Sequence, residues 1–301
     1  MDQAEKLRIV IDNLKNNLDA DQTRLPIMQT KRNARVITVT SGKGGVGKTN
    51  ISINLAIALS EQGLRVVIID ADFGLANIDV LFGIIPKYSL VDVMKNSRSI
   101  LEVLTDGPQK IKFISGGSGV EELTKLNISQ ISKFVENMEL LDRLADIIII
   151  DTGAGLSENI MSFIMAADDV LLVTTPEPTS ITDAYALIKM VSNRDRDKKI
   201  KVIVNKADNI NEAEDVMNKL VLVAEKFLGV KLDTAGNMLH DELVVRAVKQ
   251  QKPFLIGYPK STAARSIRQI ASKIIQSGED AQIQHIGIKG FLNRLVGYMK
   301  A

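Results

Sequence analysis

A glycine-rich stretch set between a strand pattern and a helix pattern constrains this chain more than any other feature. The β-branched run at residues 36–40 predicts a buried parallel strand, and apolar residues at helical spacing after residue 50 predict a helix. The stretch between them fills the phosphate-loop pattern G-x-x-x-x-G-K-[ST] with Gly42, Lys43, Gly44, Gly45, Val46, Gly47, Lys48 and Thr49. A chance glycine-rich turn does not call for both flanks, so the sequence predicts an α/β fold that binds a phosphate group.

The residue types of this loop match the needs of a phosphate. Glycines let successive backbone N–H groups curve around an anion, and the next helix points its positive end at that anion. Lys48 supplies a point charge to the β- and γ-phosphates, and the Thr49 hydroxyl is placed to ligate Mg²⁺. Asn50 completes the expected nucleotide-binding set. The loop also carries a second lysine, Lys43, directly after its first glycine.

Composition narrows the class of protein. The 301 residues contain no cysteine, which excludes disulfides and thiolate-ligated metal or iron–sulfur sites. The formal net charge of +2 argues neither for nor against nucleic-acid binding. No secretory pattern opens the chain, and no apolar run reaches the ~20 residues that span a bilayer. We therefore expect a cytosolic protein built around one large domain.

Short apolar runs alternate with helical patterns from residue 36 onward. The expected strands cover residues 36–40, 65–70, 112–115, 146–151, 170–174 and 201–205, with a weaker candidate at 229–238. This alternation predicts right-handed βαβ crossovers and a doubly wound, mostly parallel sheet with helices on both faces. Ligands of such sheets bind at the carboxyl ends of the strands. The polar residues expected there are Asp70, Asp72, Asp151 and Asn205.

Acidic residues end two of these strands. Asp151 follows four isoleucines and begins the segment Asp-Thr-Gly-Ala-Gly, so it can hold the water shell of Mg²⁺. The backbone N–H of Gly155, in the same segment, can meet the γ-phosphate. Asp72 is the candidate for orienting the attacking water, with Asp70 nearer the metal. The alternatives are a simple strand-to-loop turn at Asp151 and helix capping at the other two carboxylates.

A polar tetrapeptide, Asn205-Lys206-Ala207-Asp208, follows another predicted strand. It has the N-K-x-D form with which many GTPases read guanine, but an asparagine at this place can equally hydrogen-bond adenine. A polar surface loop is the third possibility. The residues alone do not decide between adenine and guanine. Asn205 and Lys206 are the residues expected to contact the base.

These motifs together resemble the MinD/ParA group of deviant phosphate-loop ATPases, whose loop reads K-G-G-x-G-K-[ST]. The resemblance spans roughly residues 34–276 and rests on KGGVGKT, DADFGLANID, DTGAG and VNKAD in this order. It implies ATP as the nucleotide and slow hydrolysis to ADP and phosphate within a symmetric dimer. It also implies that Lys43 reaches the phosphates of the partner chain, where it acts as an arginine finger does. Catalysis is then expected from Lys43, Lys48, Asp72 and Asp151.

The first residues sharpen the resemblance. Asp2, Gln3, Ala4, Leu7 and Arg8 fit the D-Q-A-x-x-L-R leader of the FlhG family, MinD-like ATPases that control flagellar number and placement. In that family the leader helix stimulates GTP hydrolysis by FlhF. Gln3 matches its key residue, since an amide can position an attacking water. The alternative is an amphipathic terminus that packs on its own core.

The last residues form an apolar stripe with basic flanks. Helical spacing places six apolar side chains on one face: Ile288, Phe291, Leu292, Leu295, Val296 and Met299. Such a stripe is typical of a helix lying in the plane of a membrane, and the basic flanks favour anionic lipid. It fits equally well a helix that docks on the core. Both can hold, with the tail docked in one nucleotide state and released in another.

The expected organisation has five parts: an activator helix at residues 1–20, a linker at 21–34, an ATPase domain at 35–276, a linker at 277–285 and a membrane-targeting helix at 286–301. The resemblance implies a cytoplasmic, reversibly membrane-bound switch for flagellar number and placement. Its expected partners are a second copy of the chain, FlhF, flagellar basal-body ring components and an anionic membrane surface, with no nucleic acid. The rivals are a MinD-type division-site regulator, a ParA-type DNA-partition ATPase and a non-enzymatic nucleotide-binding scaffold.

Overall fold

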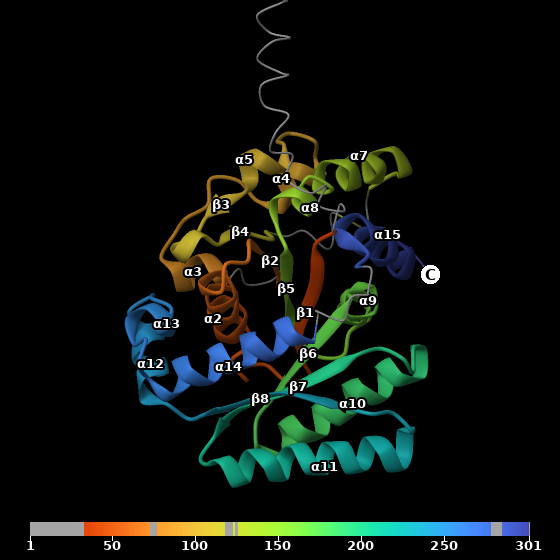
Figure 1. Ribbon diagram of the computed structural model, residues 1–301. Coiled ribbons are helices and arrows are strands. Elements are labelled where there is room, and N and C mark those ends of the chain that lie inside the picture. The colour runs from red at the N-terminus through yellow and green to blue at the C-terminus, as the bar shows by residue number, and fades with distance from the viewer. Residues whose placement is uncertain (1–32, 73–76, 118–122, 124–125, 278–284, 301) are drawn as a thin grey trace, which may run out of the picture. The chain divides into compact units, whose positions relative to one another are not determined.

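A single sheet runs through the described part of the chain. The computed structural model describes residues 33–72, 77–117, 123, 126–277 and 285–300 (Figure 1). Within them, eight strands form one sheet in the order β3-β4-β2-β5-β1-β6-β7-β8. The strands are β1 (Arg35–Ser41), β2 (Val66–Ala71), β3 (Thr105–Asp106), β4 (Lys112–Ile114), β5 (Ile147–Ala154), β6 (Asp169–Thr174), β7 (Ile200–Ala207) and β8 (Asp233–Leu239). Every neighbouring pair is parallel except β3 and β4.

Helices cover both faces of this sheet. The segment before β5 forms α2 (Lys48–Glu61), α3 (Ile78–Phe82), α4 (Leu90–Met94), α5 (Ile100–Val103), the 3-10 turn η1 (Pro108–Lys110), α7 (Ile128–Met138) and α8 (Leu141–Leu144). The rest of the chain forms α9 (Glu158–Ala166), α10 (Pro178–Arg194), α11 (Ile210–Leu228), α12 (Glu242–Lys249), α13 (Phe254–Gly257), α14 (Thr262–Gln276) and α15 (Gly287–Lys300). One face carries α2, α13 and α14, and the other carries α4, α7, α9, α10, α11 and α15.

Alternation along the strands explains why both faces are covered. All seven residues of β1 are buried, and successive side chains of a strand point to opposite faces. Val36 joins the core that contains side chains of α9 and α15, whereas Ile37 joins the core that contains those of α2 and α14. A strand buried on both faces has a continuous apolar sequence, which is why the four isoleucines of β5 show no period of two.

The predicted fold class is confirmed. Each strand expected from the sequence is present, although the weaker candidate at 229–238 begins later, at Asp233. The sequence did not predict β3, because its two residues are too few to show any period. The β1–α2 crossover places the glycine-rich loop at the carboxyl end of β1, between β5 and β6. The site predicted at the strand ends therefore has its scaffold.

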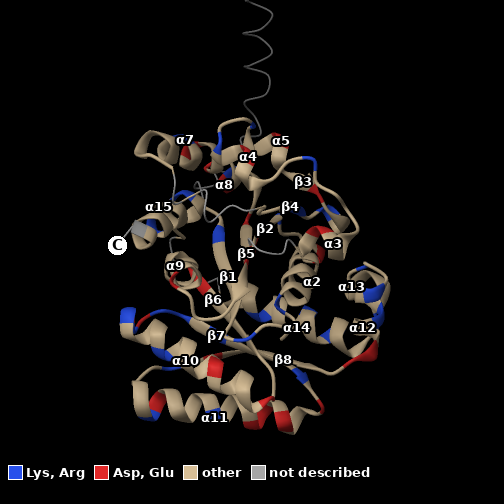
Figure 2. Ribbon diagram, turned by 180° about the vertical axis from the view of Figure 1, so that it is seen from behind, with Lys and Arg blue, Asp and Glu red and all other residues tan. Residues whose placement is uncertain are grey.

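The C-terminal helix α15 docks on the core and lies alongside α9 in both views (Figures 1 and 2). Four residues of its apolar stripe are at most 4% exposed: Ile288, Phe291, Leu292 and Leu295. The ring of Phe291 lies 6.2 Å from that of Phe163 in α9. Val296 is half-buried, and Met299 packs against the same core. Of the two interpretations of this stripe, the structure displays the docked one.

Two predicted segments lie wholly or partly outside the described residues. Residues 1–32 contain the expected activator helix and most of the first linker, and residues 278–284 contain most of the second. The activator residues stay a prediction: Asp2, Gln3, Ala4, Leu7 and Arg8. Among the helices that the structure does describe, none has the length and apolar character needed to cross a membrane.

Candidate nucleotide-binding site

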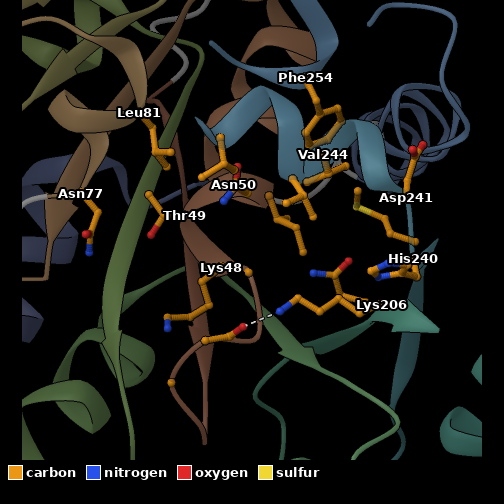
Figure 3. Close-up of a pocket in the computed structure, with 18 of the residues that line it drawn as sticks. Lys48, Thr49, Asn50, Asn77, Leu81, Lys206, His240, Asp241, Val244 and Phe254 are labelled. Atoms are coloured by element: carbon orange, nitrogen blue, oxygen red, sulfur yellow. Dashed lines mark hydrogen bonds between the residues drawn. The ribbon is translucent and has the colours of Figure 1, made fainter. Parts of the chain in front are cut away.

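A cavity of about 770 Å³ opens at the carboxyl ends of the central strands. Nine residues expected from the sequence line it: Gly44, Gly45, Gly47, Lys48, Thr49, Asn50, Asp72, Asn205 and Lys206. Six others do not: Gly42, Lys43, Val46, Gly155, Asp70 and Asp151. Figure 3 shows Lys48 and Thr49 on one side of the cavity and His240, Val244 and Phe254 on the other. The sequence thus located the cavity but described only one of its sides.

The loop needs glycine at particular positions. Gly45 and Gly47 have positive φ angles of 77° and 97°, a region that residues with a Cβ atom rarely adopt. A Cβ atom on Gly47 would also lie 2.5 Å from Nδ2 of Asn205. The loop leads directly into α2, which begins at Lys48. The backbone N–H groups at the start of this helix therefore border the cavity and favour an anion there.

Lys48 places a buried cation against the cavity. Its side chain lines the cavity although the residue is only 8% exposed. Burial lowers the pKa of its ammonium group, and the carboxylates of Asp151 and Asp72 oppose that shift. A buried charge needs a partner, and a helix N-terminus beside it attracts the same kind of ligand. Both features favour a bound phosphate at this place.

Asp151 lies beneath the loop and is fully buried. Its Oδ1 accepts a 2.8 Å hydrogen bond from Oγ of Ser52, whereas its Oδ2 has no partner among the described residues. Burial raises the pKa of Asp151 to about 6, and hydrogen bonds from Ser52 and Thr49 oppose that rise. No cluster of three or more His, Cys, Asp or Glu residues in the described ranges can hold a metal alone. The free oxygen and the Thr49 hydroxyl fit a Mg²⁺ ion whose other ligands are phosphate and water.

Asp70 is engaged in backbone capping. Its Oδ1 accepts a hydrogen bond from the N–H of Asp72 at 3.0 Å. Its Oδ2 accepts from the N–H groups of Asn77 and Ile78 at 3.0 and 3.3 Å. Burial, and then the charge of Asp151, raise the pKa of Asp70 to about 7. These contacts match the capping alternative at the start of α3, and the carboxylate lies outside the cavity lining.

Asp72 and Gly155 have different surroundings. Asp72 lines the cavity, and Nδ2 of Asn77 donates to its Oδ2 at 3.5 Å. Gly155 has a φ angle of 117°, and its N–H donates to the carbonyl of Ser41 at 2.9 Å. The N–H of Gly155, which was expected to bind a phosphate, therefore already donates to a backbone carbonyl. The carboxylate of Asp72 borders the cavity and can contact a ligand there.

Lys43 does not line the cavity of its own chain. Its Nζ lies 2.6 Å from Oε2 of Glu177 and 2.8 Å from Oγ1 of Thr179, where α10 begins. The side chains of Lys43 and Glu177 are 36% and 61% exposed, and the lysine lowers the pKa of the glutamate. Exposed pairs of this kind hold together weakly. Lys43 is therefore available for another anion.

The residues predicted to contact the base also brace the phosphate loop. Nδ2 of Asn205 donates to the carbonyl of Val46 at 2.7 Å. Nζ of Lys206 donates to the carbonyl of Gly45 at 2.8 Å (Figure 3, dashed line). Asp208, the last residue of the N-K-x-D pattern, does not line the cavity. Of this pattern, Asn205 and Lys206 therefore line the cavity, whereas Asp208 does not.

The cavity has a second wall that the sequence did not predict. It is formed by residues of β8 and of the helices after it: Met238, Leu239, His240, Asp241, Val244, Val248 and Phe254. Oδ1 of Asp241 accepts a 2.9 Å hydrogen bond from the N–H of Leu243 and so caps α12. The rule that ligands bind at strand ends identifies residues 239–241, provided that β8 is recognised as a strand first.

Comparisons with known proteins agree with this geometry. Residues 32–275 match the family described as ParA, NUBPL iron-transfer P-loop NTPase. Antiactivator FleN of Pseudomonas aeruginosa is 40% identical to this chain and covers 80% of it and 86% of its own length. Flagellum site-determining protein YlxH of Helicobacter pylori is 35% identical over 89% of this chain and 92% of its own. The chain belongs to the FlhG family of MinD/ParA-type P-loop ATPases.

A solved structure extends the comparison to three dimensions. The cell division ATPase MinD of Pyrococcus furiosus is 26% identical and matches with a TM-score of 0.64, over 81% of this chain and 99% of its own. Membership of the P-loop family implies that the FlhG-type chain binds a nucleotide with Mg²⁺ and hydrolyses ATP. Because this chain has no cysteine, the thiolate ligation on which iron–sulfur clusters depend is excluded.

Proposed function

We propose that this FlhG-family protein is an ATP-dependent switch that controls the number and placement of flagella. The role comes from two relatives, which are named an antiactivator and a flagellum site-determining protein. The working parts are the nucleotide cavity, a dimer face that contains Lys43, the tail α15 and the N-terminal activator segment. The partners are a second copy, FlhF, flagellar basal-body ring components and the anionic surface of the cytoplasmic membrane, which the protein leaves and rejoins.

The placement of Lys43 carries this proposal. Lys48 lines the cavity, whereas Lys43 lies outside it in an exposed pair with Glu177. A lysine in that position can serve the phosphates of a second copy once the weak pair opens. In a symmetric dimer each protomer then completes the site of the other, and the added charge stabilises the transition state. Hydrolysis then depends on dimerisation, and it is slow as long as the protein is monomeric.

Residues of one chain prepare the γ-phosphate for attack. Lys48 and the start of α2 bind the phosphates, and Thr49 with the free oxygen of Asp151 would hold Mg²⁺. When bound, Mg²⁺ supplies positive charge to the phosphate oxygens. Asp72, which lines the cavity, orients the attacking water. Asp70 acts indirectly, because its carboxylate holds the backbone that carries Asp72.

The surroundings of the base favour ATP over GTP. Asp208 stands outside the cavity lining, so the carboxylate that the N-K-x-D pattern uses on guanine is out of place. Nδ2 of Asn205 is committed to the carbonyl of Val46, which leaves its Oδ1 as an acceptor. The exocyclic amine of adenine is a donor, whereas guanine presents a carbonyl at the same position. An acceptor suits adenine.

The tail supplies the membrane step. The side chains that are buried in the docked α15 form one apolar stripe, which can insert between lipid headgroups once released. A single stripe of this length binds weakly and reversibly. Two stripes on one dimer raise the avidity by roughly 10²–10⁴ without any new contact. ATP-driven dimerisation then becomes membrane attachment, and hydrolysis becomes release.

Vesicle co-sedimentation tests the switch. The full chain and a variant without residues 286–301 are each mixed with phosphatidylglycerol-containing vesicles, with either ADP or a slowly hydrolysed ATP analogue. The full chain is expected to pellet more strongly with the ATP analogue, and the truncated chain is expected to stay in the supernatant with both nucleotides. Equal pelleting of the full chain in both nucleotides would contradict the switch.

A MinD-type division-site regulator is the second candidate. Septum site-determining protein MinD of Bacillus subtilis is 28% identical over 87% of this chain. Such a regulator shares the ATPase core and the tail but does not call for the N-terminal leader. Whether this protein stimulates the GTPase activity of FlhF decides between the two candidates. Our proposal requires that deleting residues 2–8, or replacing Gln3 by Ala, abolishes that stimulation while ATP hydrolysis stays unchanged.

A further inference from the structure

The start of α15 lies beside the start of β1, and one carboxylate is bonded to both. Oδ1 of Asp142, in α8, accepts a hydrogen bond from the N–H of Ala34 at 3.2 Å. The same oxygen accepts a hydrogen bond from the N–H of Ile288 at 2.9 Å. Residues 33–34 and 287–288 are far apart in the sequence, so Asp142 joins two distant parts of the chain.

A second carboxylate repeats this arrangement. Oδ2 of Asp168 accepts from the N–H of Val36 at 2.9 Å, and its Oδ1 accepts from the N–H of Ile286 at 3.3 Å. A direct bond lies between these two bridges, because Nδ2 of Asn33 donates to the carbonyl of His285 at 3.1 Å. Three separate connections thus tie the start of β1, together with the two residues before it, to the start of α15.

The backbone of α15 is shaped for this contact. Gly287 has a φ angle of 69°, which strains any residue with a Cβ atom. A Cβ atom there would lie 2.6 Å from Oδ2 of Asp142 and 2.9 Å from Cβ of Asn33. Only glycine lets the two backbones approach the carboxylate together. The close fit distinguishes this contact from an ordinary helix cap, which needs no glycine at that position.

We propose that Asp142 and Asp168 form a clasp that couples docking of α15 to the order of residues 33–36, so that release of the tail loosens the root of the N-terminal segment. The clasp holds whether or not the proposed function is right. Its biological role rests on that function, in which α15 binds the membrane and the N-terminal segment binds FlhF.

The coupling follows from what each carboxylate loses. When α15 leaves, Asp142 and Asp168 each lose a backbone donor, and Asn33 loses the carbonyl of His285. The groove that α15 fills opens to water, so the remaining bonds to Ala34 and Val36 become exposed and weaken. By linkage, a pull that displaces residues 33–36 favours release of the tail to the same degree.

Amide hydrogen exchange on the full chain tests the clasp from both sides. Asp142→Ala removes the shared acceptor, and Gly287→Ala pushes the root of α15 away while both carboxylates stay. Each variant is expected to speed exchange roughly tenfold or more at the amides of Ala34 and Ile288, which is the scale of a hydrogen bond to a charged group. The His240 amide, which bonds to the carbonyl of Ala207 and belongs neither to residues 33–36 nor to α15, is an internal reference and is expected to change little.

Lys289→Ala is the matched control. It breaks the pair of Lys289 with Glu139, a contact of the same helix that does not involve residues 33–36. Exchange at Ala34 and Val36 is expected to stay within about twofold of the wild-type rate. Asp142→Asn, which keeps an acceptor oxygen, is expected to restore most of the protection. The proposal fails if Gly287→Ala speeds exchange along α15 but leaves Ala34 and Val36 at the wild-type rate.

A vesicle arm separates this inference from the proposed function. With ADP and phosphatidylglycerol-containing vesicles, Asp142→Ala is expected to raise the pelleted fraction several-fold over wild type. If exchange rises at both chain ends while pelleting does not change, the clasp is supported and the membrane role of the tail is not. If pelleting rises while Ala34 stays protected, the tail is released without coupling, and the clasp is overturned.

Discussion

The ammonium groups of Lys43 and Lys48 belong to one loop but occupy different surroundings. Lys48 is 8% exposed and lines the nucleotide cavity. Nζ of Lys43 lies 2.6 Å from Oε2 of Glu177, outside the cavity lining. The loop therefore presents one cation to its own ligand and a second cation to another surface. Substitutions at the two positions are expected to cause different defects.

Replacing Lys48 by Ala is expected to weaken ATP binding to the monomer roughly 10- to 100-fold, because a buried charge-assisted contact with phosphate is lost. Titration with a fluorescent ATP analogue at low protein concentration measures this. Lys43→Ala is the control and is expected to bind within about twofold of wild type, because Lys43 does not line the cavity. An equal loss in both variants would show that both lysines serve their own chain.

Ser52→Ala tests the support of Asp151. The change removes the 2.8 Å hydrogen bond that Oγ of Ser52 donates to Oδ1 of the buried Asp151. The free energy of unfolding is expected to fall by about 1–3 kcal/mol, and Mg²⁺-dependent nucleotide binding is expected to weaken. Ser162→Ala is a matched control, since Ser162 is equally buried but bonds to a carbonyl within its own helix. Urea unfolding without nucleotide measures the stability, and equal losses in the two variants would contradict the assignment.

Lys198 gives the stability a pH dependence in the alkaline range. Its ammonium group donates to the carbonyl of Met165 at 2.9 Å, and burial lowers its pKa from 10.5 to about 8. Between these values the unfolded chain holds the proton and the folded chain does not, so this residue makes stability rise with pH. The free energy of unfolding of wild type minus that of Lys198→Met is expected to increase by up to about 3 kcal/mol across the window.

Urea unfolding at several pH values between 8 and 10.5 measures this difference. Lys199→Met is the control, because Lys199 is an exposed neighbour of the same charge. A difference between wild type and Lys198→Met that stays flat or falls with rising pH would contradict the shifted pKa.

Phe291→Ala tests the docking of the tail. The ring is 1% exposed and packs near Phe163, so its loss is expected to weaken docking by about 3–5 kcal/mol. Limited proteolysis of residues 286–301 is expected to become faster while the ATPase core stays intact. Tyr298→Ala on the same helix is the control, because Tyr298 is 43% exposed. Unchanged cleavage of Phe291→Ala would contradict docking through the apolar stripe.

The fold and one side of the site could be predicted because their signals are local. The phosphate loop, the strand before it and the helix after it follow one another within residues 36–59. Continuous β-branched runs marked the buried strands, because parallel strands are covered on both faces. The second wall of the cavity has no such signal. His240 and Val244 line the cavity only because β8 lies next to β7, and pairing of strands is not local.

The roles of single carboxylates and of the tail were equally beyond the sequence. Asp70 and Asp151 are paired in the register of β2 and β5. Yet the carboxylate of Asp70 accepts hydrogen bonds from three backbone amides, whereas Oδ2 of Asp151 has no partner among the described residues. The apolar stripe of α15 can bind either a membrane surface or a groove of the protein, because both require only an apolar helix face. The sequence pattern therefore does not distinguish the two. The contacts of Asp142 with Ala34 and Ile288 depend on the fold, which brings the start of β1 and the start of α15 to α8.

Complementation of two inactive variants tests the central claim most directly. Lys43→Ala lacks the cation that a partner would receive, and Asp72→Asn keeps that cation but cannot orient water in its own site. Each variant alone is expected to hydrolyse ATP poorly. An equal mixture is expected to recover up to about a quarter of the wild-type rate, because half of the dimers are mixed and each holds one complete site. No recovery, with mixed dimers present, would contradict the transfer of Lys43 between protomers.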